Sequence, residues 1–358
     1  MAVLVLKQIE ANSVSFLTTD ASITVTLATT LTDTSKTILL FSVQGVSIQP
    51  ATFCWTGRII STTQIQFDRN TASGTGTIEY QVIEFTQGIY VQHFYTAMSS
   101  SPTDVTISAI DLTKTFVICT VNANLAGWNT RHFVKADLTT TTNLQLSSVN
   151  PPVTVATQVI QIDNATVQKI TDTMGTGATK DVTVTTIDPA KTFWVFTANT
   201  TGATAVDNSV YLSYVNTTTL RFTRVAASGI DFPFILFVVS LSSGVTVQNV
   251  STVIASGNTT VSPTIPNTIT VAQTALLING FYQRFSSVND TNDDAGEAQL
   301  TVGSLTTTDF TAIRASNPAL SATTNVQVLS FSTSGAVEIF EPRTTGRGIM
   351  CGIGRGIM

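Results

Sequence analysis

Histidine, cysteine and paired carboxylates carry much of protein catalysis, and this chain of 358 residues has few of the first two. The two histidines, His93 and His132, have neither cysteine nor an acidic cluster near them in sequence, so neither belongs to a recognisable metal or acid–base set. Three widely spaced cysteines fit neither a disulfide framework nor a metal-binding pair; they are Cys54, Cys119 and Cys351. Cys54 and Cys119 lie in apolar runs, and we expect both to be buried.

No sequence motif surrounds the carboxylates of this chain. A glycosidase needs two carboxyl groups that face one another, and the candidates Asp68, Glu79 and Glu84 remain open without any motif around them. Motifs for a serine nucleophile, a zinc protease or a phosphate loop do not occur in the sequence. The sequence therefore predicts a protein that is not an enzyme, with no catalytic residue, cofactor or resident metal.

One acidic segment resembles a calcium loop in part. Asp290, Asn292 and Asp294 have the every-second-residue oxygen spacing of such loops, and Gly296 suits the sharp turn. Strict calcium loops place glycine directly after the third ligand, where this chain has Ala295. We expect residues Asp290 to Glu297 to form a solvated acidic loop, with calcium binding as the open alternative.

Three tryptophans offer either a sugar-stacking platform or core packing. Trp194 lies inside the apolar run KTFWVF, which favours a core position, whereas Trp128 in NLAGWNTR is the better exposed candidate; Trp55 remains open. Glycosylation sequons arise here from the threonine-rich composition and carry no prediction. They begin at Asn164, Asn199, Asn216, Asn249, Asn258 and Asn289.

The composition excludes several classes of protein. Hydrophobic residues make up 43% of the chain and charged residues only 11%, against about 25% charged in an ordinary soluble domain. High hydrophobicity with low charge argues against disorder. Seventeen basic against 22 acidic residues, a net charge of −5, leaves no basic footprint for nucleic acid. We therefore expect a neutral surface rich in hydroxyl groups.

The sequence shows no export or membrane signal. The first apolar run ends at Lys7, too early for a secretory signal. The longest apolar run, residues 232–241, contains Pro233 and is too short to cross a bilayer as a helix. We expect synthesis, folding and assembly in a cytoplasm.

Three sequence markers recur four times in constant order, at separations of 76 to 90 residues. The first marker is an apolar strand such as KTFVICTV, beginning at Lys36, Lys114, Lys191 and Gln273. The second, such as TTQIQF, is centred on Ile65, Leu144, Leu220 and Phe310. The third, such as YQVIEF, is centred on Val82, Val159, Val238 and Val328. Linking strands that end at Gln8, Gln92, Gln168 and Gln248 open the units. The sequence predicts units at residues 1–85, 86–162, 163–242 and 243–332, and a closing strand with a glycine-rich tail at 333–358.

Each unit has the texture of an antiparallel β-structure. Segments such as DVTVTTI alternate apolar and hydroxyl side chains, the period of a half-buried strand. KTFWVFTA and FPFILFVVSL are continuously apolar, which indicates central strands buried on both faces or at an interface. With about six strands per unit, the predicted fold is all-β: four tandem antiparallel β-sandwich-like repeats of about 80–90 residues, arranged in a row.

The tail from Arg343 onward contains GRGIM twice and ends on apolar residues. Glycine permits close approach and the apolar side chains can anchor, so we expect burial in a neighbouring subunit, with a frayed terminus as the alternative. Low charge and strand edges also favour a homo-oligomer, which deletion of residues 343–358 should weaken.

The third marker, YQVIEF followed by YVQ, is similar to repeats of bacteriophage virion proteins, in which a small β-sandwich ends in a strand of the form V-x-W-x-V-x-E-F. The unit also resembles the H-type lectin sandwich of phage fibres, a six-stranded domain that forms trimers. Tyr80 stands at the aromatic position and only Glu84 keeps the acid, since the later units have Gln161, Ser240 and Ser330. No sugar-binding residue carries over.

This resemblance implies a virion structural or adhesive protein, such as a tail fibre, spike or head-decoration component. Its expected partners are further copies of itself (three copies by the resemblance), other virion proteins and a host surface glycan. The alternative is a non-viral carbohydrate-binding or surface-filament protein.

Overall fold

The computed structural model describes residues 2–46, 54–70, 72–123, 130, 133–202, 210–224, 227–278, 300–314 and 322–333. In these ranges the chain forms four repeating units, each made of two antiparallel three-stranded sheets, which confirms the predicted all-β fold. The helical segments that the structure describes are short 3-10 turns, among them η1 (Thr34–Lys36) and η4 (Val271–Gln273). No helix in the described ranges is long and apolar enough to span a membrane.

The first two units each contain six strands. Unit 1 consists of β1 (Val5–Phe16), β2 (Ser22–Thr26), β3 (Thr37–Val46), β4 (Thr56–Ser61), β5 (Gln64–Asp68) and β6 (Thr75–Gln87). Unit 2 consists of β7 (Ile89–Met98), β8 (Thr103–Thr106), β9 (Thr115–Asn122), β10 (Val134–Thr140), β11 (Asn143–Ser148) and β12 (Val153–Ile162).

The last two units repeat this order. Unit 3 consists of β13 (Ala165–Met174), β14 (Thr179–Thr183), β15 (Thr192–Ala198), β16 (Val210–Asn216), β17 (Thr219–Arg224) and β18 (Phe232–Leu241). Unit 4 consists of β19 (Val245–Ile254), β20 (Thr260–Val261), β21 (Thr274–Ile278), β22 (Leu300–Gly303), β23 (Thr311–Arg314) and β24 (Ala322–Phe331).

The same topology recurs in every unit. The sixth strand lies between the first and the third, as in the order β1-β6-β3, and this is the unit's long sheet. The fifth strand lies between the second and the fourth, as in β2-β5-β4, and this is its short sheet. Strands of the short sheets, such as β11 and β17, alternate buried and half-buried residues, as the period of two predicts.

In the long sheet of unit 3, both the central strand β18 and the outer strand β15 are buried on both faces. All seven residues of β15 are buried, and eight of the ten in β18 are. One face of each long sheet packs on its own short sheet, as in the unit 1 cluster of Phe67, Ile78 and Tyr80. The opposite face contributes to a cluster shared by all four units, which includes Phe85, Phe116, Phe237 and Phe331. The continuously apolar runs in the sequence are explained by these two buried faces.

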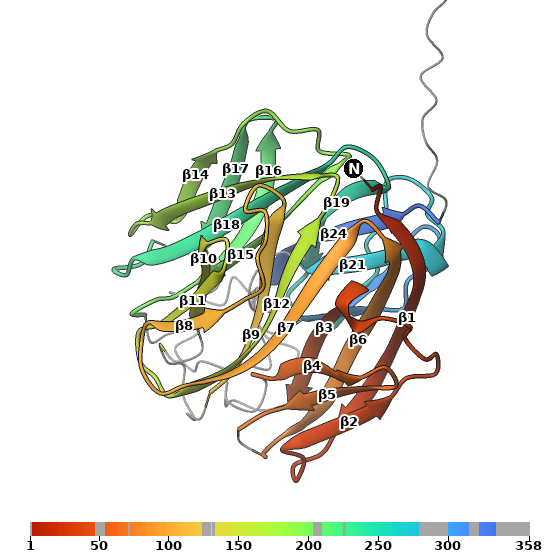
Figure 1. Ribbon diagram of the computed structural model, residues 1–358, viewed down its shortest axis with the longest axis horizontal. Helices are drawn as coiled ribbons and strands as arrows, with labels where there is room; N and C mark the ends of the chain where they lie inside the picture. Colours follow the sequence, from red (N-terminus) through yellow and green to blue (C-terminus); the bar gives the residue numbers. More distant parts are fainter. Residues whose placement is uncertain are drawn as a thin grey trace, which may run out of the picture.

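The four units close on themselves instead of forming an open row. Figure 1 shows unit 4, in blue, beside unit 1, in red, with units 2 and 3 completing the circuit. The backbone N–H of Leu6 at the start of β1 donates to the carbonyl of Ser332, just after β24, at 3.0 Å. The rings of Phe85 and Phe331 meet edge to face across the same contact, with centroids 5.2 Å apart. Consecutive units therefore meet at four seams, which we call seam 1/2, seam 2/3, seam 3/4 and the closing seam 4/1.

Two of the connections between units, after units 1 and 3, are tight turns that lie against the N-terminal segment. Gly88 and Gly244 have positive φ angles of 81° and 86°, a conformation that strongly favours glycine. A β-carbon at Gly88 would lie 2.5 Å from the carbonyl oxygen of Val3, and one at Gly244 would lie 2.7 Å from that of Leu4. Both connections therefore pack where unit 1 begins, which brings the two ends of the circuit together.

Candidate functional site

The described histidine takes part in holding two units together. His93 lies on β7 of unit 2, and its Nε2 is 3.0 Å from the carbonyl oxygen of Thr34 in η1 of unit 1. Burial lowers the pKa of His93, which favours the neutral ring. A neutral imidazole that donates to a main-chain carbonyl spans the seam without carrying charge. His132 lies outside the described residues.

The two described cysteines are core residues. Cys54 and Cys119 are 1% and 3% exposed, which confirms their expected burial. Desolvation raises the pKa of Cys119, so its thiol stays protonated and unreactive. Cys351 lies outside the described residues.

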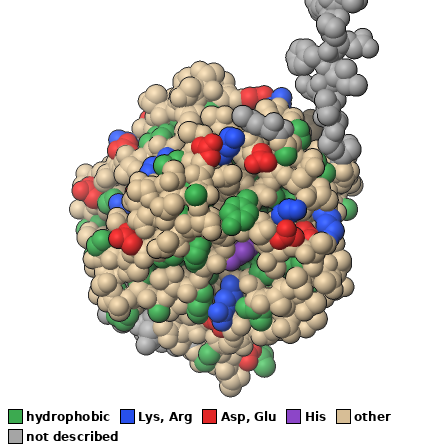
Figure 2. Space-filling model, in the orientation of Figure 1, with side chains coloured by type: hydrophobic (Ala, Val, Ile, Leu, Met, Phe, Trp, Pro, Cys, Tyr) green, Lys and Arg blue, Asp and Glu red, His purple; other side chains and the backbone are tan. Residues whose placement is uncertain are grey.

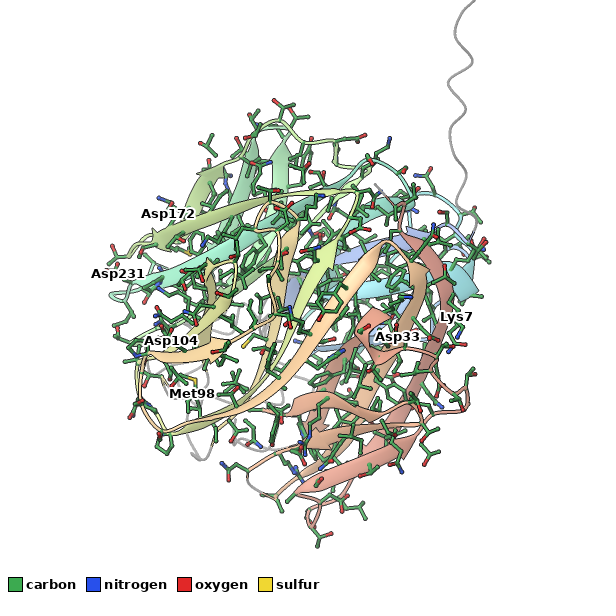
Figure 3. The ribbon with its side chains drawn as sticks, in the orientation of Figure 1. Lys7, Asp33, Met98, Asp104, Asp172 and Asp231 are labelled. Carbon is green, nitrogen blue, oxygen red and sulfur yellow. The ribbon has the colours of Figure 1, made fainter. Side chains whose placement is uncertain are left out.

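The three candidate carboxylates lie in different surroundings, and two of them hold parts of the fold. Glu84 is 1% exposed, pairs with Lys7 at 3.0 Å and accepts the backbone N–H groups of Thr32 and Asp33 at 2.7 and 3.1 Å. Figure 3 labels Lys7 and Asp33 on the same side of unit 1. Glu84 therefore fixes the turn that leads into β3.

Gln161 has the corresponding task in unit 2. It accepts the backbone N–H of Asp111 at 2.7 Å. The acid of the marker strand is thus a turn-holding group that an amide replaces without loss of the contact.

Asp68 and Glu79 have other surroundings. Asp68 accepts hydrogen bonds from Ser22 and Gln66 and lies 3.3 Å from Arg58 Nη2. Glu79 lies at the closing seam beside Gly303 of β22. Glu79 and Glu84 are five residues apart on β6, so their side chains leave opposite faces of the strand and do not face one another. No group of three or more His, Cys, Asp or Glu side chains in the described ranges could hold a metal ion.

The tryptophans that the structure describes are core residues. Trp194 is fully buried among Phe196, Phe222 and Phe234, as predicted, and Trp55 is 2% exposed. Neither presents a face to a sugar. Trp128, the acidic segment Asp290 to Glu297 and the tail from Arg343 lie outside the described residues.

Three buried arginines bind loop carbonyls within their units. They were not identified from the sequence. Arg69, Arg224 and Arg314 are 1–3% exposed and occupy the same position after the second marker. Arg224, for example, donates to the carbonyls of Gly177 and Ile230, both at 3.0 Å. A guanidinium with several donors is suited to gathering carbonyls from separate loops. Their recurrence at the end of the second marker is the sequence signal that could have revealed them.

The most regular polar contacts lie at the seams. Three glutamines at the second position of the third marker each clamp the backbone of the preceding unit. Gln158 binds both N–H and C=O of Leu39 at 2.8 and 2.7 Å. Gln327 does the same to Trp194 at 2.9 and 2.8 Å. Gln81 does so to Leu276 at 2.8 and 3.0 Å, which closes the circuit.

These glutamine clamps satisfy the free edge of a long sheet. Leu39, Trp194 and Leu276 lie on β3, β15 and β21, each an outer strand of its sheet. An amide side chain carries both N–H donors and an acceptor oxygen, so it can replace the missing neighbouring strand at one residue. At seam 2/3 the corresponding residue is Phe237, which joins the shared apolar cluster. That seam is therefore held at this position by packing.

A second set of contacts covers the edge of the neighbouring short sheet. The Thr197 hydroxyl accepts the N–H of Ala136 at 3.0 Å across seam 2/3. Ser42 accepts the N–H of Val302 at 3.3 Å across the closing seam. The same unit-to-unit direction is kept at every seam, which gives the chain an approximate four-fold arrangement.

The exposed surface carries little charge. Figure 2 shows acidic and basic side chains as small, separate spots on the visible face. One exposed aromatic residue lies beside a charged side chain. Tyr95 on β7 is 42% exposed, and the Arg58 guanidinium lies 4.0 Å from its ring centroid. Asp68 pairs with that arginine. Tyr95, the half-buried Arg58 and the buried Asp68, which we call the Tyr95 cluster, lie at seam 1/2, and the exposed ring of Tyr95 is the part that could contact a ligand.

Comparison of the sequence with protein-family models and with curated proteins finds no match.

Proposed function

We propose that this protein is a non-enzymatic structural component of a virus particle, present in many copies and assembled in the host cytoplasm. The observation that carries the proposal is the use of its chemical groups. His93, Glu84, the buried arginines and the seam glutamines all bind the chain's own backbone. Because these polar groups are used inside the protein, they make it rigid and leave a surface with little charge. Both properties suit a subunit of a particle. The similarity of the marker strands to phage virion repeats supplies the choice of particle.

Assembly with further copies of the chain is part of this proposal. The circuit covers one edge of each long sheet, whereas β1, β7, β13 and β19 are the opposite outer strands. Outer strands with unpaired backbone groups favour association unless they are covered. Three copies is the number that the fibre resemblance implies, with other virion proteins as further partners.

A carbohydrate-binding surface protein is the second candidate function, and the Tyr95 cluster favours it. The exposed ring of Tyr95 offers a stacking face, and the half-buried guanidinium of Arg58 beside it offers donors for sugar hydroxyls. The same cluster would serve a virion protein that contacts a host glycan.

Antibody labelling separates the two candidates. Antibodies raised against the full chain are applied to intact particles and to whole cells of the culture that produces the protein, and both are viewed by electron microscopy. Labelled particles are the expected result. Label on cell-surface filaments alone would overturn the virion proposal and support the second candidate.

A glycan array tests the contact surface. Tyr95→Ala should abolish any binding, while Tyr90→Ala, a change at a similarly exposed tyrosine of the same strand, should leave it unchanged. Equal loss in both variants, or binding that survives Tyr95→Ala, would exclude the Tyr95 cluster as the ligand site.

A further inference from the structure

The closing seam differs from the other three because no short connection joins its two units. Units 1 and 4 are linked along the chain only through units 2 and 3, so side-chain and backbone contacts alone hold them together. Each of the other seams joins units whose strands follow one another within a few residues. The closing seam is therefore the place where the circuit can open without breaking a chain connection.

Two polar side chains of unit 1 face β22 of unit 4 at this seam. Ser42 on β3 and Glu79 on β6 are paired directly across the two strands, which places them side by side on one face. Ser42 Oγ accepts the N–H of Val302 at 3.3 Å. The carboxyl group of Glu79 lies against the next residue, since a β-carbon at Gly303 would be 3.0 Å from Glu79 Oε2. Glycine at 303 leaves the room that this carboxyl group occupies.

Seam 3/4 shows what the same position does with an amide. Asn325 is the residue of unit 4 that corresponds to Glu79, three positions before the centre of the third marker. Its Nδ2 donates to the carbonyl of Leu212 on β16 at 3.5 Å. Leu212 corresponds to Val302, because each is paired with the matching residue of the second marker, Phe222 or Ala312. A side chain at this position of the sixth strand can therefore donate to a carbonyl on the fourth strand of the preceding unit.

A carboxyl group can donate in this way only when it is protonated. The ionised form accepts hydrogen bonds but cannot donate one, and it repels a carbonyl oxygen. The charged residues on the described strands that pair with β6 and β22 are Lys7 and Glu10 on β1 and Arg314 on β23. Lys7 pairs with Glu84. Glu10 accepts the N–H groups of Ala28 and Thr29, and Arg314 donates to Asn258 and Ala255, so both are engaged elsewhere. The described residues of β3 and β22 carry no charge.

We propose that the closing seam is a protonation-controlled latch: protonated Glu79 donates to the edge of β22 and keeps unit 4 closed on unit 1, and ionised Glu79 loosens that seam. This goes beyond the proposed structural function, because it assigns the chain a conformational response to pH.

The direction of the response follows from the burial of the carboxyl group. Burial raises the pKa of Glu79, because removal from water disfavours the ionised carboxylate. An acid whose pKa is raised by folding stabilises the closed form at low pH, and this contribution is lost as the pH rises through the folded-state value. The seam is therefore tightest in acid.

Amide hydrogen exchange followed by mass spectrometry tests the latch on the full chain. Protection of the segments 274–278 and 300–303, corrected for the intrinsic effect of pH, is compared at about pH 4.5 and about pH 8, on either side of the usual range of a buried glutamate. The wild type should lose protection at pH 8 by about tenfold for each unit by which the pKa is raised. Glu79→Gln, which keeps a donor at both pH values, should lose none.

A second variant transfers the latch to another seam. Asn325→Asp should make protection of 210–216 on β16 depend on pH, whereas the same segment of the wild type should show no such dependence. The proposal is overturned if Glu79→Gln keeps the wild-type dependence, or if both seams of the wild type respond alike. If Glu79→Gln failed to fold, an unchanged response in Asn325→Asp would still refute it.

Discussion

Replacing Gln327 by methionine removes the best-buried seam clamp while keeping the length of the side chain. Gln327 is fully buried, and its amide binds both the N–H and the C=O of Trp194 on the free edge of β15. Methionine can make neither hydrogen bond, so both backbone groups of Trp194 are left unpaired inside the protein. The expected result is a marked loss of stability at seam 3/4.

The size of the loss follows from the two orphaned groups. A buried donor or acceptor left without its partner costs about 1–3 kcal/mol, so two cost about 2–6 kcal/mol. The apolar methionine recovers about 1 kcal/mol by burial. We expect the free energy of unfolding to fall by about 3 kcal/mol.

Urea unfolding monitored by circular dichroism and by tryptophan fluorescence measures this loss. Gln145→Met is the matched control, because Gln145 is a half-buried glutamine on β11 whose side chain bonds only to Asp104; it should change stability by less than about 0.5 kcal/mol. If Gln327→Met costs no more than this control, the seam glutamines do not hold the circuit and the reasoning is refuted.

Further predictions concern single side chains. Arg224→Lys should lower the free energy of unfolding by about 2–4 kcal/mol in urea titrations, because one ammonium group cannot reach all the carbonyls that the guanidinium gathers. Gly88→Ala should cost about 2 kcal/mol or more, since φ is +81° and the new β-carbon meets Val3, whereas Gly229→Ala, with open space around it, should stay within about 0.5 kcal/mol; calorimetry compares the two. Burial lowers the pKa of His93, so its contribution is present above about pH 6.5 and lost as the pH falls through the lower folded value. The stability of the wild type relative to His93→Gln should therefore decrease in acid, and an unchanged difference between pH 5 and pH 7, about the range over which histidine titrates, would contradict this.

The repeat and its strands could be predicted because they depend on local patterns. Alternation with a period of two indicated half-buried strands such as β17, and continuous apolar runs indicated the doubly buried β15 and β18. The burial of Trp194 followed from the same run. These features depend on which face of a strand meets the core, and the side-chain order along the chain reveals that.

The candidate residues were harder to interpret because their partners are distant. Glu84 was visible as the acid of a marker strand, but its contacts with Thr32 and Asp33 show it to be the holder of a turn. The buried arginines were invisible as a group, since an arginine at the end of a polar marker looks like a surface residue until its loops fold over it. The type of a residue does not predict which distant backbone group its side chain will bind.

The sequence by itself determined that this chain is four copies of one six-stranded unit, with apolar faces, turns and polar spacers in a fixed order. Only the tertiary structure decided that the four units close into a circuit. Gln81 and its partner Leu276 are separated by 195 positions, and a polar residue in an apolar strand does not say which edge it will meet. The closure is set by the geometry of packing, because each unit leaves one sheet edge uncovered and the following unit, with unit 1 following unit 4, supplies the side chain that covers it.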